Sequence, residues 1–155
     1  MHKQFMERAI QLAGEKSSKG VCGPFGAVIV RDGKVVGEGW NRVVKTQDPT
    51  AHAEVVAIRN ACMNLGTHQL NDCVLYTSCE PCPMCLSAIY WARIDTVFYA
   101  CKASDAAAAG FDDSKIYKEV SLPLSKRSLR MTQLCREKGK KVFQAWVSNP
   151  DKKPY

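Results

Sequence analysis

The sequence predicts a single α/β domain whose helices pack against a partly parallel sheet. A hairpin signal comes first, because Asp32-Gly33 separates two strand-like apolar runs over 25–30 and 34–40. Helix-like and strand-like segments then alternate, which requires a helical crossover between parallel strands. The chain has 155 residues, 46% of them apolar, which suffices for one hydrophobic core and leaves little room for a second.

Each element follows from local signals. Phe5 and Leu12 stand among polar residues over 4–16, as in an amphipathic helix. A second helix over 52–65 should end at Gly66, since glycine suits the position just after a helix. The other expected elements are a buried strand at 73–77, a helix at 83–92, a strand at 96–101, a short helix at 103–109, a strand at 129–134 and a helix at 137–147.

Composition excludes several classes of protein. The first twenty residues are charged throughout and contain no apolar run of signal-peptide length, and no later stretch could span a bilayer. We therefore expect a soluble, cytoplasmic protein with no membrane partner. Eight cysteines would suggest a disulfide framework only in a short secreted chain. Most of them stand singly among apolar residues, where a reduced cysteine is a small buried hydrophobe.

The net charge of +7 is concentrated near the C-terminus. Residues 115–155 contain eleven of the 22 Lys and Arg residues but three of the 15 Asp and Glu residues. This segment could be an RNA-binding patch or a solvated helix face, and we favour the solvated face. Composition alone leaves both possibilities open.

Two motifs carry the chemistry, His52-Ala53-Glu54 and Pro81-Cys82-Pro83-Met84-Cys85. Because Cys82 and Cys85 lie three residues apart in the first turn of a helix, their sulfurs should share one face. The positive potential at a helix N-terminus favours the thiolate form that a metal needs. Together with His52 they give zinc three protein ligands and leave a fourth position for water, as in catalytic rather than structural sites.

Glu54 distinguishes this pattern from a plain zinc knuckle. In a regular helix positions 52 and 54 diverge by about 200°, so both can face the metal only at the helix entry. A glutamate placed there is better interpreted as a proton carrier than as a ligand. Neither motif is specific alone, but H-x-E followed by P-C-x-x-C is the signature of zinc deaminases.

Cys79 offers a competing interpretation of the second motif. Cys79-x-x-Cys82-x-x-Cys85 is also how a ferredoxin cluster motif begins, but residues 86–100 contain no further cysteine. A structural zinc knuckle is possible, although it leaves Glu54 unexplained. We expect Cys79 to pack beside the ligands rather than to bind metal.

Five segments of the chain form a recognisable set: GPFGAVIV, DPTAHAEVVAIRNAC, LYTSCEPCPMCLSAIYWAR, AGFDDSKIYKE and FQAW with the terminal tyrosine. Together they resemble the guanine deaminases of the cytidine-deaminase-like superfamily. The metal motifs are shared with tRNA adenosine deaminases, whereas Gly-Phe-Asp-Asp and Tyr155 point to guanine. The resemblance implies a three-layer α/β/α sandwich around a mixed five-stranded sheet. It also implies that the chain hydrolyses guanine, a free purine base, to xanthine and ammonia.

The resemblance also assigns site residues. The implied residues are His52, Cys82 and Cys85 for one zinc per chain, Glu54 and Asp113 for proton transfer, and Phe25, Asn41, Trp91, Phe111 and Tyr155 for purine binding. Taken alone, Asn41 could be a turn residue, Asp113 a helix N-cap and the aromatic residues ordinary core. Residues 1–155 would form one catalytic domain in which 140–155 is a lid exchanged between the subunits of a homodimer.

Other functions stay open at the level of sequence. Within the same chemistry, the chain could be a tRNA-specific adenosine deaminase or could deaminate guanosine or a related aminopurine. From a different class, it could be a non-catalytic zinc module that binds RNA. We favour a small-molecule substrate over a nucleic-acid partner.

Overall fold

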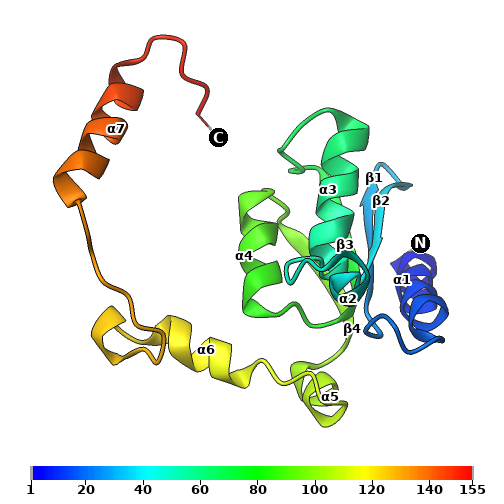
Figure 1. The fold of residues 1–155 in the computed structure, drawn as a ribbon. Coiled ribbons are helices and arrows are strands. Elements are labelled where there is room, and N and C mark those ends of the chain that lie inside the picture. The colour runs from blue at the N-terminus through cyan, green and yellow to red at the C-terminus, as the bar shows by residue number, and fades with distance from the viewer. Residues whose placement is uncertain (1, 155) are drawn as a thin grey trace. The chain divides into compact units, whose positions relative to one another are not determined.

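The computed structural model describes residues 2–154, which divide into two compact units. The first unit extends to Lys115 and the second begins at Ile116. Helices and strands alternate through the first unit, whereas the second contains no strand among its described residues (Figure 1). No helix among residues 2–154 is long and apolar enough to cross a membrane.

A mixed sheet forms the centre of the first unit. Its strands, in the spatial order β2-β1-β3-β4, are β1 (Gly26–Arg31), β2 (Lys34–Trp40), β3 (Cys73–Cys79) and β4 (Thr96–Cys101). β1 is antiparallel to both of its neighbours, and β3 is parallel to β4. Asp32 and Gly33, with φ of 50° and 72°, form the tight turn of the predicted hairpin, which is confirmed.

The predicted fifth strand is wrong, since the described residues contain four. Residues 129–134 form neither helix nor strand, and Leu129, Met131 and Leu134 are exposed. An extended segment becomes a strand only when a neighbouring strand accepts its backbone hydrogen bonds. The described part of the second unit offers none, so the short apolar run stays irregular.

Helices cover both faces of the sheet, which confirms the α/β sandwich (Figure 1). Against one face lies α1 (His2–Ser17), whose Phe5 and Leu12 pack with Val28 of β1. The opposite face packs against α3 (Ala53–Leu65) and α4 (Pro83–Trp91), and α4 makes the crossover between β3 and β4. Because successive side chains of β1 point to opposite faces of the sheet, β1 contributes to a hydrophobic core on each face.

Two glycines of β2 allow α3 to approach the sheet closely. A Cβ on Gly39 would lie 2.2 Å from the carbonyl oxygen of Ala53 and 2.5 Å from the backbone nitrogen of Ala57. A Cβ on Gly37 would similarly lie 2.5 Å from the carbonyl oxygen of Ala57. Because these neighbours are backbone atoms, only a shift of the helix could make room. The start of α3, which follows His52, is therefore placed by Gly39.

We predict that Gly39→Ala weakens metal binding more than Gly26→Ala does. Both substitutions overpack a helix against the sheet, at a cost of roughly 1–3 kcal/mol. Gly26 is the matched control because its Cβ would lie 2.3 Å from the carbonyl oxygen of Ala9, which belongs to α1 on the opposite face. Urea unfolding measures the shared cost, and titration with Co²⁺ measures the metal affinity. Equal metal affinities in the two variants would contradict the prediction.

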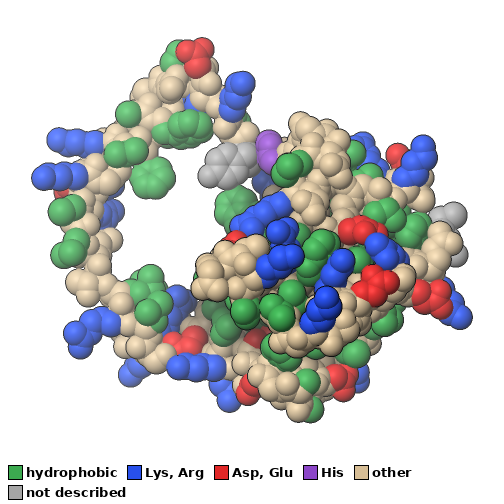
Figure 2. Space-filling model, turned by 45° about the vertical axis from the view of Figure 1, so that its right-hand side comes forward, with side chains coloured by type: hydrophobic (Ala, Val, Ile, Leu, Met, Phe, Trp, Pro, Cys, Tyr) green, Lys and Arg blue, Asp and Glu red, His purple; other side chains and the backbone are tan. Residues whose placement is uncertain are grey.

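The remaining helices are α2 (Val43–Thr46), α5 (Ala103–Ala108), α6 (Ser114–Ser121) and α7 (Arg136–Ser148). Helices were expected near α5 and α7, which the structure confirms, whereas α2 and α6 were not predicted. In the second unit, basic side chains are interspersed with apolar ones along the segment on the face shown in Figure 2. On that face the basic residues do not form one continuous patch.

Candidate active site

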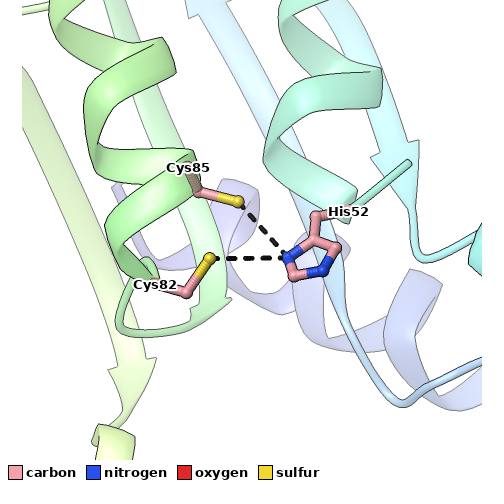
Figure 3. Close-up of side chains that lie close together, drawn as sticks. All are labelled: His52, Cys82 and Cys85. Carbon is pink, nitrogen blue, oxygen red and sulfur yellow. Dashed lines mark hydrogen bonds between the residues drawn. The ribbon is translucent and has the colours of Figure 1, made fainter. Parts of the chain in front are cut away.

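Two helix N-termini bring the metal-binding motifs together (Figure 3). His52 is the N-cap of α3 and Cys82 the N-cap of α4, both with extended backbone, and Cys85 lies in the first turn of α4. The Nδ1 atom of His52 lies 3.5 Å from Sγ of Cys82 and 3.6 Å from Sγ of Cys85. The three potential ligand atoms all lie within 4.8 Å of one another.

This donor set fits zinc. One imidazole nitrogen and two cysteine sulfurs are the ligands of catalytic zinc sites that keep a fourth position open. Bond lengths of about 2.0–2.1 Å to nitrogen and 2.3 Å to sulfur place tetrahedral N and S ligands roughly 3.5 Å apart. The observed separations of 3.5 and 3.6 Å agree with that spacing.

The hydrogen bonds and charges around these three residues favour the deprotonated form of one cysteine. Hydrogen bonding with the Cys85 thiol lowers the pKa of Cys82 to about 4, and the neighbouring His52 adds to the effect against the opposing cost of burial. The pKa of Cys85 is raised, mainly because its thiol is the partner of Cys82. The pKa of His52 is raised chiefly by its hydrogen bond with Cys82. These shifts favour a thiolate at Cys82, and metal binding would displace the proton of Cys85.

Glu54 lies buried beside this triad, with 5% of its surface exposed. Its Oε1 accepts a hydrogen bond of 2.9 Å from the hydroxyl of Thr77, and its Oε2 lies 3.3 Å from Sγ of Cys85. Burial raises the pKa of Glu54. Because His52 precedes the first helical turn, the side chains at 52 and 54 both reach the same place, as the spacing had required.

A cavity of about 90 Å³ opens onto His52, Cys82 and Glu54. The predicted residues Phe25, Asn41, Phe111 and Asp113 also line it. The rings of Phe25 and Phe111 meet edge to face, with centroids 5.0 Å apart and planes at 89°. Such a pair presents apolar walls of fixed orientation.

Asn41 and Asp113 differ in whether they also serve the local backbone. The Asn41 side-chain oxygen accepts a hydrogen bond of 3.3 Å from the Val43 backbone, so Asn41 is a turn residue as well as a lining residue. At the start of α6, the side chain that accepts the Ser114 backbone N–H, at 2.9 Å, is that of Asp112. Asp113 instead lines the cavity, where burial and then the charge of Cys82 raise its pKa.

Trp91, a predicted purine-binding residue, is not among the residues that line this cavity. Trp91 is the last residue of α4, at the opposite end from Cys85, and it is 64% exposed. Its contribution to purine binding therefore stays a prediction. The length of α4 explains this position, because Trp91 lies six residues after Cys85. Tyr155 lies outside the described residues.

Sequence reasoning missed Glu80 and the wall formed by α5. The Oε2 atom of Glu80 accepts a hydrogen bond of 3.0 Å from the backbone of Ala103, which fixes the start of α5. Ala103 and Ala106 then line the cavity. The charge between Cys79 and Cys82 could have drawn attention to Glu80. The alanines carry no chemical signal, so nothing in the sequence pointed to them.

Comparisons with known proteins agree with this geometry. The family model described as the cytidine and deoxycytidylate deaminase zinc-binding region matches residues 1–101. The chain is 56% identical to guanine deaminase of Bacillus subtilis over 154 residues, which cover 99% of each chain. It is also 38% identical to the tRNA-specific adenosine deaminase of Haemophilus influenzae, over 74% of this chain and 69% of that one.

Solved structures give the same result. The X-ray structure of B. subtilis guanine deaminase superimposes with a TM-score of 0.96 at 55% identity, covering 100% of this chain and 99% of that one. Guanine deaminase from Nitrosomonas europaea gives a TM-score of 0.66 at 33% identity, over 70% of this chain and 63% of that one. From the His52-Cys82-Cys85 triad, the family match and the full-length similarity it follows that this chain belongs to the cytidine and deoxycytidylate deaminase family, among its guanine deaminases.

Proposed function

We propose that this protein hydrolyses guanine to xanthine and ammonia. The observation that carries the proposal is the buried carboxylate of Glu54 beside the His-Cys-Cys triad, inside a cavity with aromatic walls. The likeness over the full chain to a guanine deaminase supports guanine as the substrate. A structural relative at 34% identity with a TM-score of 0.67 was solved in complex with 2,6-diaminopurine, another aminated purine.

In the proposed reaction Glu54 moves protons. Zinc bound by His52, Cys82 and Cys85 supplies Lewis acidity, which makes water a better nucleophile at neutral pH. The Glu54 carboxylate accepts one proton as water attacks C2 of the base and passes it to the ring nitrogen. It then accepts the second proton of that water from the hydroxyl on C2 and passes it to the amine, which leaves as ammonia while the C2 carbonyl forms. The proton on the amine is needed because the amide ion, NH2⁻, is a poor leaving group. Asp113, which lines the same cavity, assists as a second proton carrier.

The cavity walls suit a free planar base. Phe25 and Phe111 flank the space, and the amide of Asn41 and the carboxylate of Asp113 offer polar groups to the edge of the ring. A few polar groups within apolar walls are typical of small-molecule sites. Asp112 and Asp113 together would repel a phosphate backbone, which favours a base over RNA.

The proposal is tested by ammonia release from free guanine, measured with and without a chelator. We expect xanthine and ammonia in equal amounts, and loss of both on chelation. Guanosine and a tRNA anticodon stem are the comparison substrates. The tRNA is the second candidate because tRNA-specific adenosine deaminases match the chain and the second unit is basic. Inosine formed in the tRNA, with no xanthine from guanine, would reverse this ranking.

We further propose that residues 1–155 act as one cytoplasmic catalytic domain whose segment 140–155 closes the site of a partner subunit. Within the second unit, α7 exposes Val142, Phe143, Trp146 and Val147, an apolar surface that a second copy could cover. Pro154 restricts the backbone next to Tyr155, and an aromatic residue in this segment is suited to exclude water from a reacting base. All eight cysteines are free, which suits a reducing compartment.

Deleting residues 151–155 should leave zinc bound and remove most of the activity, because the open site would admit bulk water. Lys152→Ala with Lys153→Ala is the matched control, since it removes the charge of the tail and keeps its aromatic end. Normal turnover in the truncated protein would refute the lid.

Mixing the truncated chain with a Glu54→Gln chain separates exchange from closure within one chain. With exchange, a mixed dimer joins an intact Glu54 site to an intact tail, so activity recovers. If the tail closed its own chain's site, neither chain would carry both parts and the mixture would stay inactive.

A further inference from the structure

We infer that Thr77 is a positioning residue that holds the Glu54 carboxylate in the orientation required for proton transfer. The inference rests on the proposed function of the site and adds a residue from β3, which neither metal motif contains. Thr77 Oγ1 donates a hydrogen bond of 2.9 Å to Oε1 of Glu54, across 23 residues of sequence.

The hydroxyl of Thr77 lies in a largely apolar part of the core. Thr77 is 1% exposed and lies on the face of β3 that also presents Leu75 toward α3 and α4. Its strand neighbour Ala27 belongs to the same apolar cluster. Burying a hydroxyl among apolar groups is unfavourable unless it is hydrogen-bonded. Here the partner is the catalytic carboxylate itself.

Metal binding makes the hydrogen bond from Thr77 the more important of the two that join Glu54 to other side chains within residues 2–154. The second contact is with Sγ of Cys85, 3.3 Å from Oε2. A cysteine that binds zinc is a thiolate and has no proton to donate. The hydrogen bond from Thr77 does not depend on the metal, so it persists in the loaded site.

The division of the two oxygens has a direct chemical consequence. With Oε1 held by Thr77, Oε2 is the oxygen directed at the triad, 3.3 Å from Cys85. Oε2 is therefore the oxygen that exchanges protons with water and the amine. Without the Thr77 hydroxyl the carboxylate could rotate about its last bond. Proton transfer between groups that are slightly misplaced is slow, and a displacement of 1 Å can cost about 10²-fold in rate.

The test compares Thr77→Val, which removes the hydroxyl and keeps the shape, with Thr77→Ser, which keeps the hydroxyl. Ser78→Ala is the matched control. Ser78 is the next residue of β3, is 7% exposed and accepts a hydrogen bond of 3.1 Å from the Gly26 backbone. Both Thr77→Val and Ser78→Ala therefore delete one buried hydroxyl, and neither removed group is expected to touch substrate or metal.

We expect Thr77→Val to lower kcat for guanine by roughly 10–100-fold with KM and zinc content unchanged. Thr77→Ser should restore kcat to near the wild-type value, and Ser78→Ala should lower stability as much as Thr77→Val while keeping kcat. Thr77→Ala is measured in parallel, because its smaller side chain fits even if valine does not.

Other outcomes would overturn the inference. Equal kcat in Thr77→Val and Ser78→Ala would show that the hydroxyl does not act on Glu54. Loss of zinc or of the fold in both Thr77→Val and Thr77→Ala would assign Thr77 to the core alone. A wild-type protein that releases no ammonia from guanine would contradict the proposed function instead, so the two failures are distinguishable.

Discussion

Glu54→Gln should keep its zinc and its fold and lose roughly 10²-fold or more of its turnover of guanine. Glutamine has the same shape as glutamate, and its carbonyl oxygen can still accept the hydrogen bond that Thr77 donates to Oε1. In place of Oε2 the glutamine carries an amide NH2 group, which cannot accept a proton from water at neutral pH. The substitution therefore removes the proton transfer and leaves the packing.

Metal analysis, thermal unfolding and steady-state kinetics on one preparation make this test decisive. Glu80→Gln is the comparison, because Glu80 also lines the cavity but its Oε2 serves the backbone of Ala103, a role that a glutamine carbonyl can fill. We expect a much smaller loss of turnover in Glu80→Gln. Full activity in a zinc-replete Glu54→Gln protein would refute the role of Glu54.

The parts of the fold that sequence predicts well are those fixed by local rules. Asp32-Gly33 determines the hairpin because both residues adopt positive φ. Gly66 ends α3 in the left-handed conformation that glycine tolerates best. The metal residues were equally predictable, since His52 and Cys82 stand at helix starts that their own motifs specify.

The incorrect prediction concerns an element whose formation depends on tertiary contacts. The run over 129–134 has strand-like composition, but a strand needs a neighbour, and no local signal shows whether one exists. Sequence reasoning also missed the roles of Thr77 and Glu80. Each residue forms its hydrogen bond with a partner 23 residues away, so no local motif contains both partners.

Replacing either sulfur ligand by alanine should remove zinc, whereas Cys79→Ala should retain it. Cys79 is the matched control because it is buried, lies three residues before Cys82 and belongs to the same Cys-x-x-Cys-x-x-Cys run. Its Sγ contacts the carbonyl oxygen of Lys102 at 3.6 Å, outside the triad. Burial raises the pKa of its thiol to about 11.

The expected loss is large for Cys82→Ala and Cys85→Ala. Removing a partner that merely orients a ligand lowers metal affinity about 10–100-fold, so removing a direct ligand should lower it further. Metal content by mass spectrometry and the visible spectrum of the Co²⁺-substituted protein report the site without relying on turnover. We expect one zinc per chain in the wild type and Cys79→Ala, and well below one in the other two variants. Loss of zinc from Cys79→Ala, or iron–sulfur absorbance in the wild type, would mean that Cys79 joins Cys82 and Cys85 as a metal ligand, which contradicts the His52-Cys82-Cys85 site.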